Sequence, residues 1–231
     1  MKKDKIINNS FIKNKSIIIT LILSLIVSII TNIFLFNNSI DKENSILMDE
    51  NIVFFGDSIT NKYTVEEFFS DKYVINSGIS GDKTEDLIER IEDDVYKYNP
   101  SKVFLLIGIN DLNNGVDEEK IINNIQKIVN GIKLKRKYTK IYIESIYPIN
   151  RNTFNEKEYE FNENITNDKI KEINKKLENL CKENDVEYID VFSKLIDEEG
   201  NLKDIYTIEG LHLNDLGYFK ITKVLEKYIY N

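Results

Sequence analysis

Two short segments near opposite ends of the sequence carry residues suited to nucleophilic chemistry. Ser58 stands in the segment Gly-Asp-Ser-Ile-Thr at 56–60, directly after the apolar run 52–55. A tight turn into a helix there would expose its hydroxyl and point its backbone N–H toward an anion. His212, the only histidine, has the near-neutral pKa that a base for serine needs. Glu209 precedes it by three residues and could orient the imidazole and stabilise its cation.

A third segment could supply donors for an oxyanion. Asn110 follows the most apolar run, 103–107, and its side-chain amide could act with the backbone N–H groups of Ser58 and Gly78. Each of these features also has a structural explanation. Serine and asparagine cap helices and form turns, and a histidine beside an acid is common in folded proteins. The local residues leave both explanations open.

Apolar runs of strand length alternate with amphipathic stretches along residues 51–231. This alternation is typical of βαβ units around a parallel sheet, so we expect a three-layer α/β/α sandwich with a mostly parallel five-stranded sheet. The expected strands are 52–55, 73–75, 103–107, 141–146 and 186–189. Apolar residues at helical spacing predict helices over 87–95, 121–129, 170–180 and 219–228.

The expected sheet also locates the chemistry. Open parallel sheets place their sites at the carboxyl ends of the strands. Glycine permits close approach of the backbone to a ligand at such a place. Four of the glycines fall just after strand candidates: Gly56, Gly78, Gly81 and Gly108.

Composition excludes several classes of protein. The 231 residues carry a net charge of −8, which argues against a nucleic-acid partner, because binding phosphates requires a basic face. The single cysteine, Cys181, cannot form an internal disulfide. One histidine and one cysteine cannot build the usual zinc sites, so we expect no structural zinc. We also expect no cofactor.

The N-terminal segment predicts membrane attachment. Residues 1–15 hold five lysines and one aspartate, and residues 16–36 hold no charge. A helix over 16–36 would be about 31 Å long, enough to span a bilayer. The charge bias places the basic tail inside and the remainder outside. We therefore expect a polar tether over 37–50 and a folded domain over 51–231. A cleaved signal peptide with a secreted domain, or a buried soluble helix, are the alternatives.

Taken together, these segments resemble the SGNH hydrolases, also called the GDSL esterase/lipase family. The matching blocks are Gly-Asp-Ser-Ile at 56–59, Asn-Ser-Gly at 76–78, Gly-Ile-Asn-Asp at 108–111 and Glu-Gly-Leu-His at 209–212. They occur in the family's order and span nearly all of the expected domain. The resemblance implies a flavodoxin-like fold, ester hydrolysis through an acyl-serine, no metal, and substrates from acylated sugars to lysophospholipids.

The resemblance also implies roles for single residues. They are Ser58 as nucleophile, His212 as base, and Ser58, Gly78 and Asn110 as the oxyanion hole. The family usually has aspartate where this chain has Glu209, and the extra methylene moves the carboxylate outward by about a bond length. Either the loop adjusts, or a backbone carbonyl orients the imidazole and Glu209 only assists. Asp204 and Asp215 are the other acids near His212 in sequence.

Substrate choice is only partly indicated. The polar segment 151–167 contains Phe154, Tyr159 and Phe161 and is long for a connection, so it is either a lid or substrate wall, or a surface loop. An outward-facing esterase on a membrane meets glycans and lipids. Acetyl esters of surface carbohydrate are the first hypothesis, and lysophospholipids are the second. An O-acetyltransferase and an inactive tethered binding module remain open.

Overall fold

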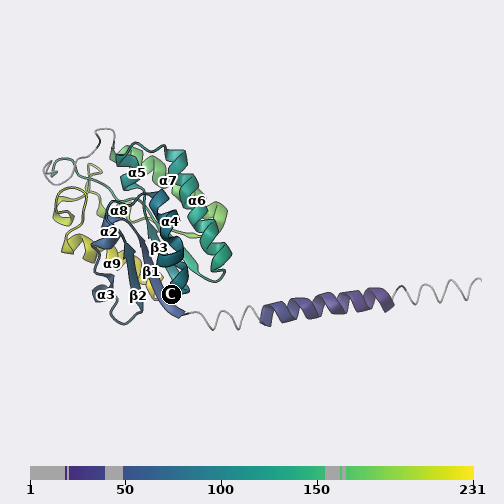
Figure 1. Ribbon diagram of the computed structural model, residues 1–231. Coiled ribbons are helices and arrows are strands. Elements are labelled where there is room, and N and C mark those ends of the chain that lie inside the picture. The colour runs from purple at the N-terminus through teal and green to yellow at the C-terminus, as the bar shows by residue number, and fades with distance from the viewer. Residues whose placement is uncertain (1–18, 20, 40–48, 154–161, 163–164) are drawn as a thin grey trace, which may run out of the picture. The chain divides into compact units, whose positions relative to one another are not determined.

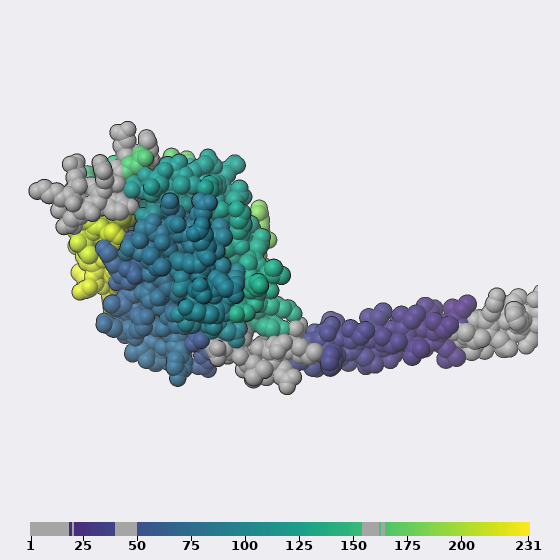
Figure 2. All heavy atoms as spheres, viewed as in Figure 1, coloured from purple at the N-terminus to yellow at the C-terminus, as the bar shows by residue number. Residues whose placement is uncertain are grey.

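The computed structural model describes residues 19, 21–39, 49–153, 162 and 165–231, which are the coloured parts of Figure 1 and Figure 2. The chain divides into two units, Met1–Leu47 and Met48–Asn231. The described part of the first unit is a helix, Leu21–Ser39, which is long and apolar enough to cross a membrane. A signal sequence would have the same character. The predicted span 16–36 overlaps this helix, and residues 16–18 and 20 lie outside the described part of the chain.

The second unit is built on a five-stranded parallel sheet with the order β2-β1-β3-β4-β5. Its strands are β1 (Asp49–Gly56), β2 (Val74–Gly78), β3 (Pro100–Leu106), β4 (Lys140–Glu144) and β5 (Glu187–Ile189). After β1 the chain moves to one side to form β2 and then returns to the other side to form β3. The connections therefore change direction at the carboxyl end of β1, the place where open parallel sheets bind ligands.

Helices cover both faces of the sheet. Figure 1 shows α4 (Thr84–Asp94), α6 (Glu118–Lys135) and α7 (Asn167–Asn184) on one side. On the other side lie α3 (Val65–Phe68), α8 (Phe192–Leu195) and α9 (Asp215–Ile229). The remaining elements are short, namely α2 (Ser58–Asn61), η1 (Tyr96–Tyr98), α5 (Ile109–Asn113) and η2 (Asp204–Tyr206).

The two faces of the sheet follow from strand alternation. Phe54, Phe104 and Tyr142 are cross-strand partners, and their rings stack with centroid distances of 4.8 and 4.7 Å. Tyr142 meets Tyr228 of α9 edge-on at 5.5 Å, so these rings belong to the α9 side. The residues that adjoin these rings along each strand face α4, because successive side chains of a strand point in opposite directions. The Arg90 guanidinium lies 4.6 Å from the Phe55 ring on that side.

The expected three-layer α/β/α architecture is confirmed. One difference in the sheet concerns β2, which we predicted to end at residue 75 and which continues to Gly78. Its polar end pairs in register with the end of β1, Gly56 opposite Gly78. Backbone pairing with β1 thus extends β2 through residues whose side chains are not typical of a strand.

The predicted insertion at 151–167 falls largely outside the described residues, which omit 154–161 and 163–164. Its three aromatic residues, Phe154, Tyr159 and Phe161, are all among those omitted. The prediction of a lid or substrate wall stays a prediction.

Candidate active site

Ser58 lies at the carboxyl end of β1 as the first residue of the short helix α2. The cap of this helix is Asp57, whose Oδ1 accepts a hydrogen bond from the Ile59 backbone N–H at 2.9 Å. Ser58 itself is not needed as the cap, which was the structural explanation for its presence. Its side chain is available for another partner.

That partner is His212, 154 residues further along the chain. The distance from Ser58 Oγ to His212 Nε2 is 2.9 Å, and both residues are buried at the rim of the sheet, 7% and 8% exposed. This is hydrogen-bond geometry for a hydroxyl and an imidazole. The structure therefore brings together a hydroxyl and an imidazole that lie near opposite ends of the domain sequence.

Glu209 contacts the other nitrogen of the ring. Its Oε1 is hydrogen-bonded to His212 Nδ1 and also accepts from the His212 backbone N–H at 3.1 Å. A proton on Nδ1, facing this carboxylate, leaves the lone pair of Nε2 toward Ser58. The longer side chain of Glu209 thus reaches the imidazole directly. Asp204 instead accepts from Asn150, and Asp215 is exposed at the start of α9.

The loop that carries these two residues is tightly held. The Thr207 hydroxyl donates to the His212 carbonyl at 2.8 Å and accepts from the Gly210 N–H at 2.7 Å. The Gly210 carbonyl accepts from the Asn150 N–H at 2.7 Å. Gly210 has a φ of +94°, and a Cβ there would lie 2.1 Å from the Asn150 carbonyl oxygen. Only glycine fits this backbone without displacing its neighbour.

Burial sets the protonation of the base. Desolvation lowers the His212 pKa below its ordinary value of 6.5, and the charge and hydrogen bond of Glu209 oppose this shift without cancelling it. Nearby Lys62 disfavours the cation further. A lowered pKa keeps the imidazole neutral at neutral pH, the form that can accept a proton from Ser58.

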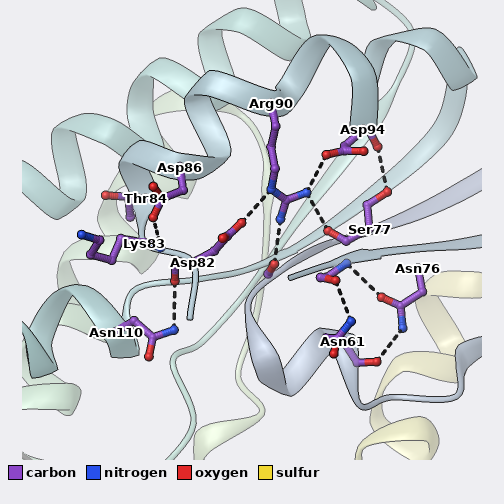
Figure 3. Close-up of polar contacts among 12 residues, drawn as sticks. Asn61, Asn76, Ser77, Asp82, Lys83, Thr84, Asp86, Arg90, Asp94 and Asn110 are labelled. Carbon is purple, nitrogen blue, oxygen red and sulfur yellow. Dashed lines mark hydrogen bonds and ion pairs between the residues drawn. The ribbon is translucent and has the colours of Figure 1, made fainter. Parts of the chain in front are cut away.

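Asn110 lies on α5, directly beyond the end of β3, and is 4% exposed. Its Nδ2 donates to the Asp82 carbonyl at 2.9 Å, which ties α5 to the loop after β2 (Figure 3). The amide side chain is therefore held by the loop that leads from β2 into α4.

Gly78 has a different partner from the one that the sequence led us to expect. Its backbone N–H donates to Asn76 Oδ1 at 2.9 Å. A Cβ on Gly78 would lie 2.2 Å from the Asn61 backbone nitrogen, so close packing against α2 explains the glycine. In this structure the Gly78 amide is therefore engaged with Asn76.

Asp57 is a buried acid that sequence reasoning did not single out. It is 1% exposed, and within the described part of the chain its Oδ2 has no hydrogen-bond partner. Burial raises the pKa of Asp57 to about 7, and the charges of Asp111 and Asp82 add to the rise. An aspartate before a helix is common as a cap, and the sequence around Asp57 gives no sign that it is buried.

No group of three or more His, Cys, Asp or Glu side chains in the described residues is arranged to hold a metal ion.

A pocket of about 620 Å³ is lined by residues close in sequence to this site. Lys62 donates its backbone N–H to the Ser58 carbonyl, and Leu213 follows His212. Ile208 and Leu216 also line the pocket and are 61% and 60% exposed.

Known proteins share this arrangement of fold and motifs. The family model described as GDSL-like lipase/acylhydrolase matches residues 54–219. Human platelet-activating factor acetylhydrolase IB subunit alpha2 is 25% identical over 188 residues, which cover 78% of this chain and 76% of that protein. The N-acylneuraminate cytidylyltransferase of Streptococcus agalactiae is 28% identical over 125 residues, 51% of this chain. The match spans 26% of the length of that relative.

Solved structures agree with the sequence matches. A protein of Streptococcus pneumonia, provisionally described as a platelet activating factor, is 31% identical with a TM-score of 0.73, covering 90% of this chain and 99% of that one. A GDSL-like lipase of Bacteroides thetaiotaomicron is 24% identical with a TM-score of 0.69, covering 84% and 96%. The chain therefore belongs to the GDSL-like lipase/acylhydrolase family of serine ester hydrolases.

Proposed function

We propose that the domain hydrolyses carboxylic esters through an acyl intermediate on Ser58. The observation that carries the proposal is the chain of contacts from Ser58 Oγ to His212 Nε2, at 2.9 Å, and from His212 Nδ1 to Glu209. Such a chain activates a weak nucleophile by giving its proton a base, and gives that base a charge partner. Membership of the family supports the same chemistry.

The reaction follows from these contacts. His212 Nε2 takes the Ser58 proton as Oγ attacks the ester carbonyl carbon, and Glu209 stabilises the imidazolium. Collapse of the tetrahedral intermediate breaks the bond to the alcohol, which leaves with the proton from His212. Water, deprotonated by His212, then attacks the acyl-serine and releases the acid.

For the oxyanion we propose the Ser58 N–H and the Asn110 amide as donors. We place the remaining donor at Gly81 instead of Gly78, whose N–H binds Asn76. Gly81 has a φ of +89° and precedes Asp82, whose carbonyl accepts from Asn110. A Cβ on Gly81 would meet no atom within 4 Å, so its surroundings leave space for a substrate.

The substrate class we propose is short acyl esters, acetyl esters in particular, of surface carbohydrate. The acyl part is supported by the relative named as an acetylhydrolase, 25% identical over 78% of this chain. The carbohydrate part rests on the expected outward position of the domain. We propose that the helix Leu21–Ser39 is an uncleaved membrane anchor with its basic tail inside, a cleaved and secreted form being the alternative.

A lysophospholipid is the second candidate, and one observation favours it. The pocket of about 620 Å³ exposes Ile208 and Leu216, apolar surface of the kind that receives an alkyl chain.

A chain-length series tests both candidates. The full chain, purified in detergent, is assayed with p-nitrophenyl esters from acetyl to octanoyl, beside Ser58→Ala. We expect Ser58-dependent hydrolysis with the highest kcat/KM for acetyl, whereas a preference for octanoyl would favour the lipid. Hydrolysis unchanged in Ser58→Ala would contradict the acyl-serine mechanism.

Two further outcomes concern the alternatives. A glycan acceptor that gains the acetyl group in place of water would identify an O-acetyltransferase. An inactive binding module would fail to react with a fluorophosphonate probe at Ser58.

A further inference from the structure

Arg90 connects several chain segments that lead to the candidate active site. It lies in the middle of α4, with its side chain 15% exposed, and its guanidinium packs over the Phe55 ring of β1. Figure 3 shows the guanidinium at the centre of polar contacts that reach the ends of β1 and β2 and the loop between β2 and α4.

The contacts join three segments of backbone. Nη2 donates to the Gly56 carbonyl at 3.0 Å, two residues before Ser58. Nη1 donates to the Ser77 carbonyl at 3.0 Å, at the end of β2, and to Asp94 Oδ2 at 2.9 Å. Nε donates to Asp82 Oδ2 at 2.7 Å.

Two of these segments lead to groups that the proposed reaction uses. The Gly56 carbonyl precedes the turn that presents Ser58. Asp82 is held through its side chain by Arg90, while its backbone carbonyl holds the Asn110 amide at 2.9 Å. A single side chain therefore links the turn of the nucleophile to the loop that orients an oxyanion donor.

The chemistry of the side chain suits this task. A guanidinium is planar, stays charged, and presents its donors in a rigid fork, so it can bind two carbonyls and two carboxylates at fixed angles. A lysine ammonium is a point charge on a flexible stem and cannot reproduce the fork. The hydrogen bonds of Arg90 go to the Gly56 and Ser77 carbonyls and to the carboxylates of two aspartates, so it would act through the backbone.

We propose that Arg90 is a positioning residue that holds the Ser58 turn and the Ile79–Asp82 loop in the arrangement that stabilises the oxyanion. The proposal rests on the ester hydrolysis proposed above. Oxyanion donors act in the transition state, so loosening them lowers kcat and leaves KM nearly unchanged.

The test compares Arg90→Lys and Arg90→Gln with a matched control, Arg136→Gln. Arg136 also donates to a backbone carbonyl, that of Tyr96, at 2.9 Å from Nε, and its guanidinium lies 5.9 Å from the Tyr96 ring. Tyr96 lies before the start of β3, at the opposite end of the strand from Asn110. The control therefore removes a similar interaction away from the site.

We expect kcat for p-nitrophenyl acetate to fall about 10- to 100-fold in Arg90→Gln with KM unchanged, since small misplacements of catalytic groups have effects of that size. Arg90→Lys should lose less, and Arg136→Gln should retain wild-type kcat. Asp82→Asn, which keeps the backbone and removes the negative charge that pairs with Arg90, should also lower kcat. It serves as the second variant if Arg90→Gln does not fold.

Hydrogen exchange provides a readout that does not depend on turnover. Arg90→Lys should speed the exchange of amides in peptides covering 78–83 and 107–112, whereas Arg136→Gln should not. Unchanged exchange there, or equal loss of kcat in the Arg90 and Arg136 variants, would overturn the positioning role. If the wild-type chain showed no Ser58-dependent hydrolysis, the proposed function would fail, and the exchange data would still decide the role of Arg90.

Discussion

Replacement of Glu209 by the shorter acid that the family usually has should impair this protein. In Glu209→Asp the carboxylate keeps its charge and retracts by about 1.5 Å, the length of one C–C bond, which takes it out of hydrogen-bond range of His212 Nδ1. The loop cannot follow easily, because Thr207 and Asn150 hold it on both sides of Glu209. Gly210, with its φ of +94° and its close contact to Asn150, leaves little room for a shift.

The size of the effect follows from the contact that is lost. Glu209 is 5% exposed, so water cannot fully replace it as a partner of the imidazole. A hydrogen bond to a charged group contributes about 1.5–3 kcal/mol. At 1.36 kcal/mol for each factor of ten, kcat/KM should fall about 10- to 150-fold.

The assay is steady-state hydrolysis of p-nitrophenyl acetate by the full chain and by two variants of Glu209. Glu209→Gln keeps the reach and loses the charge, whereas Glu209→Asp keeps the charge and loses the reach. Glu198→Asp, at an exposed position, controls for the same substitution away from the site. A Glu209→Asp variant as active as the wild type would refute the reasoning, because it would show that the loop adjusts freely to the shorter acid.

Three further predictions concern the same site. Asn110→Ala should lower kcat about 10²- to 10³-fold with little change in KM, the usual cost of deleting one oxyanion donor, and an unchanged kcat would remove Asn110 from the mechanism. The pH profile of kcat/KM should fall toward acid with a midpoint below 6.5, because burial lowers the His212 pKa, and Glu209→Gln should shift the midpoint lower still by removing the charge that opposes this effect. Asp57→Asn should raise Tm relative to the wild type by an amount that grows between pH 4 and pH 8. The pKa of Asp57 in the folded protein, about 7, lies above its ordinary value of 3.8, so the folded wild type loses stability as the pH rises between these values. A Tm difference that does not depend on pH would contradict the burial argument.

The sequence predicted the fold well because the strands of this sheet are apolar runs with few competing explanations. A continuous apolar run such as Val103 to Ile107 indicates a buried strand by itself, without information on the strands that pair with it. The end of β2 was missed because its pairing depends on β1, not on its own side chains. The position of His212 against Ser58 was predictable from motif order, since His212 is the one histidine of the chain.

Other parts of the site could not be read from the sequence. The Gly78 amide is engaged because the Asn76 side chain folds back onto it, a contact that no spacing rule reveals. Arg90 and Asp57 matter through burial and through partners distant in sequence. A mostly buried arginine in the middle of an amphipathic helix looks the same in sequence as a solvated one. Whether Glu209 reaches the imidazole depends on the path of its loop, which contacts with Thr207 and Asn150 determine.

Identification of the residue that becomes acylated tests the central claim most directly. The full chain in detergent is treated with a fluorophosphonate, digested, and its peptides are weighed by mass spectrometry, beside Ser58→Ala and His212→Ala. We predict a single adduct on Ser58, absent from Ser58→Ala and formed far more slowly in His212→Ala. Modification at another residue, or ester hydrolysis that persists in Ser58→Ala without an adduct, would contradict the account.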